Sequence, residues 1–283
     1  MLNFNRFPGG RRFALTFSYD DGTAHDERLV SVFNKAGVKC TFHLNSAKMT
    51  GGDGGDTGAS GDTAAAFVQA SRAKELYAGH EIACHTLTHP FPCEIARDRL
   101  LFEITQDRLN LERFSGEIIR GMSYPFGQYD RRVIETMLAC GIDYSRTVAS
   151  TGGFGIPRDF MEWHPTCHHN SAEEPVAKFL ALVNGQTPAR HEMRLLNIWG
   201  HSYEFERDDN WRLIENIAGR LGGNDKIWYA TCAEIRDYVC AVRAMRSSVC
   251  GTRFRNPSGI SVFAENENGA VFEIKPGAEN DCE

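Results

Sequence analysis

The sequence predicts an α/β fold, a (β/α) barrel that need not be complete, with a small β appendage at its C-terminal end. Short β-rich segments alternate with amphipathic segments six or more times, which is typical of a mostly parallel sheet covered by helices. The sequence contains neither a GxGxxG fingerprint nor a Walker loop, and this favours a barrel over a doubly wound nucleotide-binding sheet. A chain of 283 residues is long enough for one such domain and an appendage.

The predicted strands are short runs rich in β-branched and aromatic residues that end near glycine or polar residues. We expect them at Phe13–Tyr19, Val38–Leu44, Glu81–Cys84, Ile118–Tyr124, Ile142–Val148, Leu195–Trp199 and Lys226–Ala230.

The predicted helices lie between these strands. We expect them at Asp26–Lys35, Ala65–Tyr77, Glu94–Phe114, Arg131–Ala139, Pro175–Val183 and from Thr231 to about Arg243. Gly37 is expected to end the first helix, and Thr231 with Glu234 forms the capping box that opens the last one.

Two segments break the alternation. Residues Met49–Thr63 are rich in Gly, Asp, Ser and Thr, so we expect a mobile loop that buries little. Near the C-terminus, Ile260–Glu265 and Val271–Ile274 are expected to be two strands joined through Asn268-Gly269, a strong hairpin signal. We therefore divide the chain into a barrel, 1–248, and a β-hairpin appendage, 249–283.

The amino-acid composition argues against two classes of binding partner, nucleic acid and membranes. The net charge is −6 and no dense run of Lys or Arg occurs, which argues against nucleic acid. No apolar stretch approaches the roughly 20 residues that span a bilayer, and no signal peptide is seen, so we expect no membrane partner and a cytoplasmic protein. The nine cysteines form no CxxC pair and are expected to be free thiols. The composition does not indicate the oligomeric state.

Carboxylates and imidazoles follow two of the predicted strands. Asp20 and Asp21 come directly after the first strand, where Gly22 allows a turn that can bring both carboxylates to one site. His85 and His89 come directly after Glu81–Cys84 and are four residues apart. Two histidines and a carboxylate with open positions are typical of a catalytic metal site. Barrel enzymes keep their reactive groups at these strand ends.

Two further motifs follow later strands. Tyr124-Pro125-Phe126-Gly127 comes after the fourth strand, and Trp199-Gly200-His201 comes after a late one. A histidine at a strand end can serve as a general acid near neutral pH, although such a histidine taken singly is more often structural.

Taken together, these motifs resemble those of the NodB-type polysaccharide deacetylases, metal-dependent carbohydrate esterases, in order and spacing over about residues 13 to 204. The resemblance implies a distorted or incomplete (β/α) barrel of that type. It implies Asp20 as general base, Asp21 as a metal ligand with His85 and His89, and His201 as general acid. It also implies one divalent metal ion, zinc most commonly, with cobalt or another divalent ion as alternatives. The backbone N–H of Phe126 would then stabilise the oxyanion.

The chain departs from the family pattern at two places. Many relatives have an arginine immediately before the third motif, where this chain has Ser123, and we expect Arg146 to take its place. The usual acidic partner of the last histidine is not recognisable, and Asp159 is our candidate. We expect Tyr124, Pro125, Phe126, Trp199, Arg146 and Trp163 to contribute to oxyanion or substrate binding.

The sequence therefore predicts a metal-dependent hydrolase that removes N- or O-linked acetyl groups from an acetylated carbohydrate. Two alternatives stay open: a glycan-binding barrel without turnover, and a metal amidohydrolase or deformylase acting on a small non-sugar amide. Neither the glycan nor the type of acetyl linkage follows from the sequence.

Overall fold

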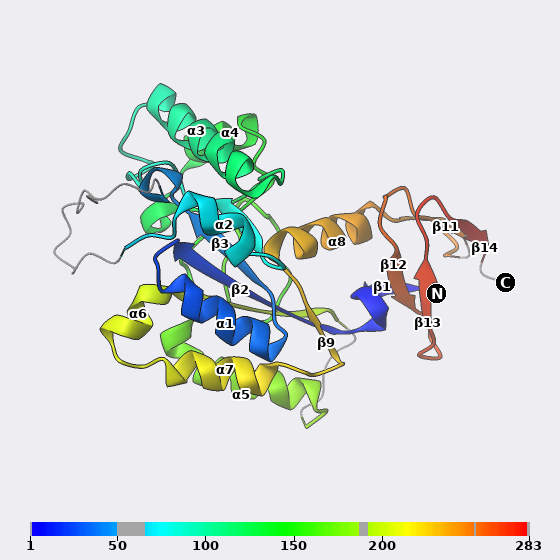
Figure 1. The fold of residues 1–283 in the computed structure, drawn as a ribbon. Coiled ribbons are helices and arrows are strands. Elements are labelled where there is room, and N and C mark those ends of the chain that lie inside the picture. The colour runs from blue at the N-terminus through cyan, green and yellow to red at the C-terminus, as the bar shows by residue number, and fades with distance from the viewer. Residues whose placement is uncertain (1, 50–65, 187–191, 252, 282–283) are drawn as a thin grey trace.

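The computed structural model describes residues 2–49, 66–186, 192–251 and 253–281 (Figure 1). The expected loop Met49–Thr63 lies, except for Met49, outside these residues. Within the described ranges, no helix has both the length and the apolar character needed to cross a bilayer.

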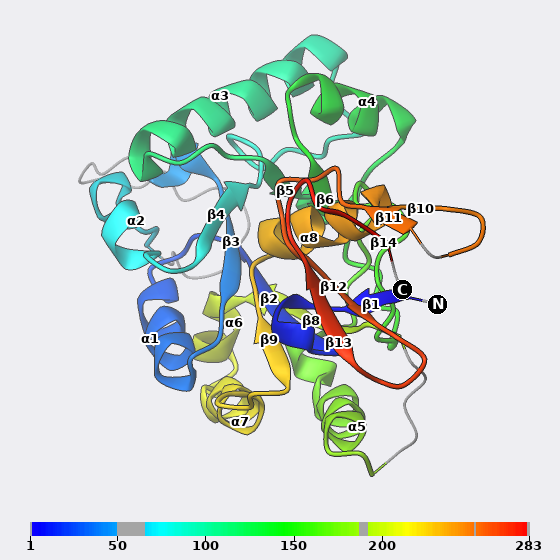
Figure 2. The ribbon, with the colours of Figure 1, turned by 90° about the vertical axis from the view of Figure 1, so that its right-hand side faces the viewer.

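The main sheet has eight strands, and every pair within it is parallel. Along the sheet the order is β6-β5-β4-β3-β2-β8-β7, with β9 paired to β2 as well. The strands are β2 (Phe13–Asp21), β3 (Cys40–Leu44), β4 (Glu81–Cys84), β5 (Gly121–Ser123), β6 (Tyr144–Arg146), β7 (Cys167–His168), β8 (Arg194–His201) and β9 (Ile227–Tyr229). The sheet curls without closing, so the predicted distorted, incomplete barrel is confirmed (Figure 2).

Strand β2 is the centre of the sheet. Its whole length pairs with β8, while on its other side β9 pairs with Phe13–Leu15 and β3 pairs from Phe17 onward. Residues 13–20 are all buried, and large apolar side chains at every second position from Phe13 to Tyr19 alternate with small or polar ones from Ala14 to Asp20, so the two faces of the strand differ in character. Asp20 and Asp21 are the last two residues of the strand and lie at the edge shared by the other carboxyl ends.

Helices cover the curled sheet (Figures 1 and 2). They are α1 (Asp26–Ala36), α2 (Ala70–Leu76), α3 (Arg97–Ser115), α4 (Arg131–Ala139), α5 (Glu173–Val183), α6 (Ser202–Arg207), α7 (Arg212–Leu221) and α8 (Cys232–Ala244). Gly37 ends α1 in the left-handed conformation with φ 68°, and the Thr231 capping box opens α8, as the sequence predicts.

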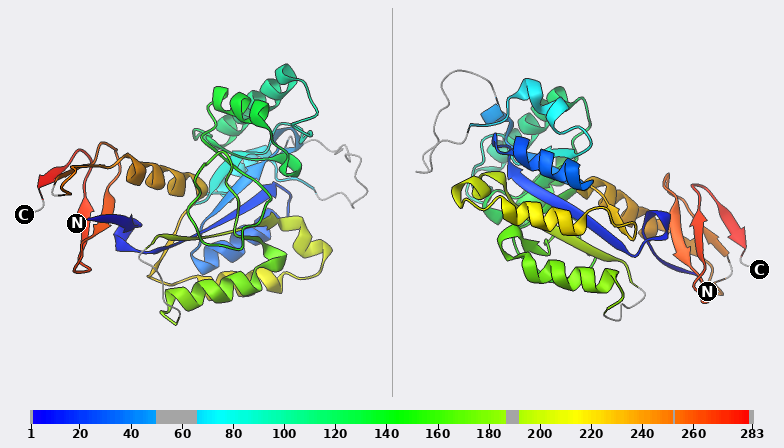
Figure 3. Two further views of the ribbon diagram at one scale, coloured as in Figure 1. Left: turned by 180° about the vertical axis from the view of Figure 1, so that it is seen from behind. Right: turned by 60° about the horizontal axis from the view of Figure 1, so that its bottom comes forward.

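Two small antiparallel sheets lie beyond α8 (Figure 3). One contains β1 (Asn3–Arg6), β12 (Val262–Glu265) and β13 (Val271–Ile274), and the other contains β10 (Arg246–Ser247), β11 (Arg253–Arg255) and β14 (Glu279–Asp281). The predicted hairpin is present, with the Gly269 N–H donating to the Asn266 carbonyl at 3.0 Å. The N-terminal strand joins this hairpin, a pairing of the two chain ends that the sequence pattern does not reveal.

Candidate active site

The residues named by the sequence motifs lie at one edge of the main sheet because all its strands are parallel. Asp20 and Asp21 end β2, His85 follows β4, Arg146 ends β6 and His201 ends β8. Asp20 and His201 are direct Cα partners on the neighbouring strands β2 and β8. Side chains paired in this way point to the same face of a sheet, so this pair faces the barrel interior.

Asp21 turns its carboxylate back toward the same site. Its φ is 80°, and Gly22 follows with φ 71°, so two consecutive residues leave the strand conformation. A positive φ is unfavourable for a residue with a Cβ, and aspartate is among the side chains that tolerate it best. The two adjacent carboxylates can therefore serve one site.

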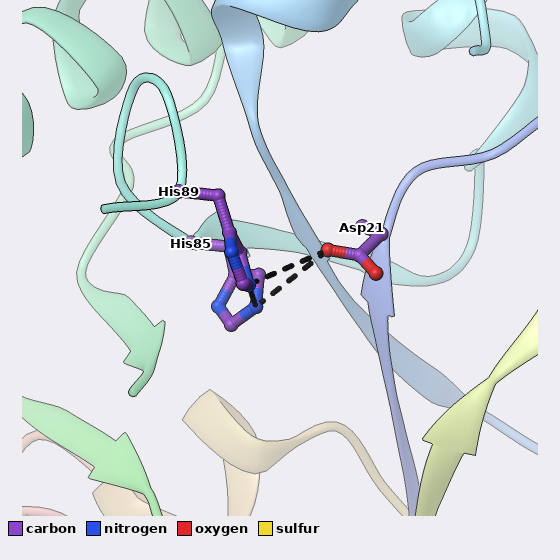
Figure 4. Close-up of side chains that lie close together, drawn as sticks. All are labelled: Asp21, His85 and His89. Atoms are coloured by element: carbon purple, nitrogen blue, oxygen red, sulfur yellow. Dashed lines mark hydrogen bonds and ion pairs between the residues drawn. The ribbon is translucent and has the colours of Figure 1, made fainter. Parts of the chain in front are cut away.

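Asp21, His85 and His89 converge, and we call them the primary metal group (Figure 4). Oδ1 of Asp21 lies 3.8 Å from Nε2 of His85 and 3.7 Å from Nε2 of His89. The two Nε2 atoms are 3.1 Å apart. The three predicted metal ligands thus present one carboxylate oxygen and two imidazole nitrogens to a common point.

The primary metal group fits a divalent ion. Oδ1 of Asp21 is buried and has no hydrogen-bond partner, although such atoms are nearly always paired. Nδ1 of His85 lies 2.9 Å from the Ser123 carbonyl, which only accepts, so Nδ1 carries the proton and Nε2 keeps its lone pair. Burial lowers the pKa of both histidines, that of His89 to about 3, so both rings are neutral as ligands must be.

Two buried carboxylates on α3 hold the loop that carries these histidines. Glu103 accepts hydrogen bonds from the backbone N–H and the hydroxyl of Thr88, each at 2.8 Å. Asp107 accepts from the His85 backbone N–H at 3.1 Å and from that of Ser46 at 2.8 Å. The sequence analysis missed both carboxylates; their signal is acidic residues on the side of α3 that also carries Leu100, Ile104 and Leu111.

Asp20 is buried beside the primary metal group and is held by two donors. The Ser123 hydroxyl donates to Oδ1 at 3.0 Å, and the Arg146 guanidinium donates to Oδ2. Burial opposes the charged carboxylate, yet Arg146, followed by three histidines, holds the pKa of Asp20 well below its usual range. Arg146 and Ser123 together therefore fix the direction of the Asp20 carboxylate.

Arg146 is itself locked in place. Its side chain is fully buried, its Nε donates to the Ser18 hydroxyl at 2.9 Å, and its guanidinium carbon lies 4.5 Å from the Trp199 ring centroid. The Ser18 hydroxyl also contacts Nε2 of His43 at 2.9 Å. Trp199 thus lies beneath the arginine that orients Asp20.

Glu204 is the acidic partner of His201. Its Oε2 lies 3.3 Å from Nδ1 of His201 and accepts from the His201 backbone N–H at 3.2 Å. Burial lowers the pKa of His201, but the carboxylates of Glu204, Asp21 and Asp20 outweigh it and the net pKa is raised. Asp159 was the wrong candidate, because its Oδ1 instead accepts from the Met161 backbone N–H two residues away.

Phe126 lies next to His89 with its ring half exposed. The two ring centroids are 4.5 Å apart, and Phe91 stacks on Phe126 with centroids 3.8 Å apart and an interplanar angle of 11°. The exposed fractions of Phe91 and Phe126 are 41% and 51%. The sequence analysis missed Phe91, although it follows the histidine motif directly after Pro90.

The remaining predicted residues are buried. Pro125 lies inside the 3-10 turn Pro125–Gly127, and the Tyr124 hydroxyl donates to the Met161 carbonyl at 2.8 Å. The backbone of Trp163 bridges to Arg146, but its ring lies in the core. Its ring is 1% exposed, packs edge-to-face on Tyr144 and Phe160, and lines a separate cavity of about 380 Å³.

Comparison with known proteins gives one family. The model of the polysaccharide deacetylase family matches residues 8–145. A putative polysaccharide deacetylase from Mycobacterium smegmatis is 16% identical, with a TM-score of 0.57 over 84% of this chain and 93% of that one. The Xyl-CE4 domain of a multidomain xylanase from the hindgut metagenome of Trinervitermes trinervoides is also 16% identical, with a TM-score of 0.50 over 79% of this chain and 89% of that one.

A further match covers a smaller share of both chains. The deacetylase PplD of Streptococcus pyogenes is 17% identical, with a TM-score of 0.41, and the match covers 47% of this chain and 55% of that one. No curated protein matches the sequence. At these identities the Mycobacterium smegmatis and Xyl-CE4 structures show a shared fold.

Proposed function

The chain belongs to the polysaccharide deacetylase family through its residues 8–145, and we propose that it is a metal-dependent hydrolase that removes acetyl groups from a carbohydrate. The observation that carries the proposal is the primary metal group, in which the unpaired Oδ1 of Asp21 faces Nε2 of His85 and His89. The oriented carboxylate of Asp20 lies beside it, with Oδ2 3.9 Å from Nε2 of His85.

Asp21, His85 and His89 would hold one divalent ion, and zinc suits this His₂-carboxylate set. When bound, such an ion supplies Lewis-acid chemistry, polarising an acyl carbonyl and lowering the pKa of water. The protein's own part is to keep both imidazoles neutral and correctly turned, which Ser123 does for His85.

Asp20 is the proposed general base. It is ionised and fixed in direction by Ser123 and Arg146, so it can accept a proton as water attacks the acetyl carbon. A carboxylate with a low pKa is a weak base, so its contribution depends on position more than on basicity.

His201 is the proposed general acid. Nδ1 faces Glu204, which leaves Nε2 for the departing amine or sugar oxygen. The raised pKa of His201 favours the protonated ring, the form that donates. Glu204 acts through His201 as a positioning residue.

The 3-10 turn after β5 supplies the proposed oxyanion donor. Phe126 adopts φ 56°, and the hydrogen bonds of the turn come from the N–H groups of Gly127 and Gln128. The Phe126 N–H is therefore our candidate for stabilising the tetrahedral oxygen.

The stacked rings of Phe91 and Phe126 support a sugar substrate over a small amide. Together they offer an exposed aromatic surface in contact with the ligand His89. The apolar face of a pyranose packs well on such a surface, and adjoining exposed apolar side chains often mark a binding site.

An acetate-release screen tests the proposal. Metal-loaded protein is offered chitooligosaccharides, acetylxylan, small acetylated sugars and a formylated or acetylated amino acid, with Asp20→Asn as the inactive control; formate is measured for the formylated compound and acetate for all the others. We expect release from at least one carbohydrate and none from the amino acid derivatives. Release from the amino acid derivatives alone would favour a small-amide hydrolase, and no release from any compound would favour a glycan-binding barrel.

A further inference from the structure

Glu204 faces two imidazole nitrogens in addition to that of His201. Its Oε2 lies 3.0 Å from Nε2 of His168, 3.3 Å from Nδ1 of His201 and 3.4 Å from Nε2 of His169. One ligand atom from each of His168, His201 and Glu204 lies within 4.8 Å of the others. We propose that His168, His201 and Glu204, the second metal group, bind a second divalent transition-metal ion.

Two of the three separations in the group are close to those around a tetrahedral ion, and the third is within 4.8 Å. Imidazole and carboxylate ligands about 2.0–2.1 Å from zinc are separated from one another by about 3.3–3.4 Å. The Glu204 oxygen lies 3.0 Å and 3.3 Å from the two nitrogens of the group. Two imidazoles and a carboxylate, with a position left open, are a common set for zinc, cobalt or nickel.

Unpaired nitrogens also point to a missing ligand. Nδ1 of His201 and Nε2 of His169 are buried and have no hydrogen-bond partner, although each lies close to Glu204. The His169 ring is fully buried and aimed at the carboxylate. Each nitrogen lies 3.3 Å or 3.4 Å from Oε2 of Glu204 without a well-aligned hydrogen bond, and a bound ion would be a direct partner for Nδ1 of His201. The side chains of His168 and His201 are each 21% exposed, so an ion can reach them from solvent.

The second metal group binds its ion more weakly than the primary one. The Asn170 backbone N–H donates to Nδ1 of His168 at 3.3 Å, which places the proton of the neutral ring on Nε2. An ion on Nε2 requires that proton to move to Nδ1, so the hydrogen bond from Asn170 is given up. His85 in the primary metal group already holds its proton on Nδ1.

Occupation of the second metal group inhibits the enzyme, a consequence that rests on the proposed function. An ion on Nδ1 of His201 takes the place of the second proton of the imidazolium. The remaining Nε2–H then belongs to a neutral, metal-bound ring, which is a far weaker acid than imidazolium. The first ion therefore activates acetate release and the second suppresses it.

Metal counting tests the site without relying on activity. Metal-free wild type, His168→Gln and His89→Gln are dialysed against Zn²⁺ and the bound ion is counted, with folding checked by circular dichroism. His164→Gln is the matched control, because His164 lies on the same segment, is exposed and belongs to neither metal group. We expect one more ion in wild type and in His164→Gln than in His168→Gln, and that His89→Gln loses the tighter ion only.

Equal ion counts in wild type and His168→Gln would overturn the second site. Acetate release provides the second readout: wild type should rise with the first equivalent of zinc and fall with the second, whereas His168→Gln should not fall. If no variant releases acetate, the proposed function fails while the ion counts still decide the site. If wild type is active and the counts are equal, the site fails and the function stands.

Discussion

Arg146 at the end of β6 donates a hydrogen bond to Asp20 on β2, although β3, β4 and β5 lie between these strands in the sheet. The contact is possible because the sheet curls and brings its β6 edge back toward β2. The orientation of the proposed base, Asp20, therefore depends on the curvature of the barrel. Both side chains are buried, so each charge depends on the other.

Substitution of Arg146 should reduce the rate more than substrate binding. Arg146→Met leaves the Asp20 carboxylate free to rotate, and we expect kcat to fall about 10²-fold, the loss typical of a misplaced catalytic group. Arg146→Lys keeps the positive charge but lacks the planar guanidinium with its several fixed N–H donors, so it should recover part of the rate. The double variant Asp20→Asn with Arg146→Met should melt at a higher temperature than Arg146→Met alone, because it leaves no unpaired buried charge. Full activity in a folded Arg146→Met protein would contradict the orienting role.

Substitution of His201 should slow the reaction more when the leaving group is poorer. General acid catalysis is worth about 10²–10⁴-fold, and His201→Ala should slow sugar deacetylation by roughly that factor. Nitrophenyl acetate should be affected far less, because nitrophenolate leaves without a proton. Rates are compared at one equivalent of metal. Equal losses on both substrates would remove His201 from the proton transfer.

Phe91 should contribute to sugar binding. An aromatic contact is worth about 0.5–1.5 kcal/mol, so Phe91→Ala should raise KM for an oligosaccharide by about 2- to 10-fold with kcat little changed. Phe102→Ala is the matched control, since Phe102 is a similarly exposed phenylalanine on α3. An unchanged KM, or the same change in Phe102→Ala, would exclude the aromatic surface as a binding element.

Titration of Asp26 should lower the free energy of unfolding as the pH rises. Burial raises its pKa to about 7, whereas an unfolded aspartate has a pKa of about 3.9. Between these values the folded protein keeps a proton that the unfolded chain releases, so its stabilising effect is complete below about pH 4 and is lost as the pH rises through 7. The Tyr77 hydroxyl donates to the same carboxyl at 2.7 Å.

Asp26→Asn removes this titration. The melting temperature of the variant relative to wild type should therefore be higher at pH 8 than at pH 5. At this chain length a change of 1 kcal/mol shifts the melting temperature by about 2–4 °C, which calorimetry resolves. Parallel melting curves across this range would show that Asp26 does not titrate as described.

The parts of the site that could be predicted are those set by local sequence. Asp20 and Asp21 end β2, and His85 directly follows β4 with His89 four residues further on, so their place at the sheet edge follows from strand direction. Several strands are shorter than their apolar patterns, as in Ile118–Tyr124, of which β5 contains three residues, whereas β2 and β8 extend past theirs to Asp21 and His201. Pro125 has no N–H with which to continue the pairing of β5.

The parts that could not be predicted depend on tertiary contacts. Glu204 is three residues from His201, but its role follows from the helix turn that folds its side chain back. Glu103 and Asp107 reach the histidine loop only because α3 packs over β4. Trp163 looks like a sugar-binding aromatic in the sequence, whereas the structure places its ring in the core.

The central claim is tested most directly by metal-dependent acetate release. Protein stripped by a chelator is assayed on the best carbohydrate of the screen before and after one equivalent of zinc is restored, in wild type, His85→Ala and Asp20→Asn. The account predicts that wild type regains activity, that His85→Ala binds one ion fewer and stays inactive, and that Asp20→Asn binds as many ions as wild type without releasing acetate. Equal acetate release by metal-free and zinc-restored wild type, or full activity in His85→Ala, would contradict it.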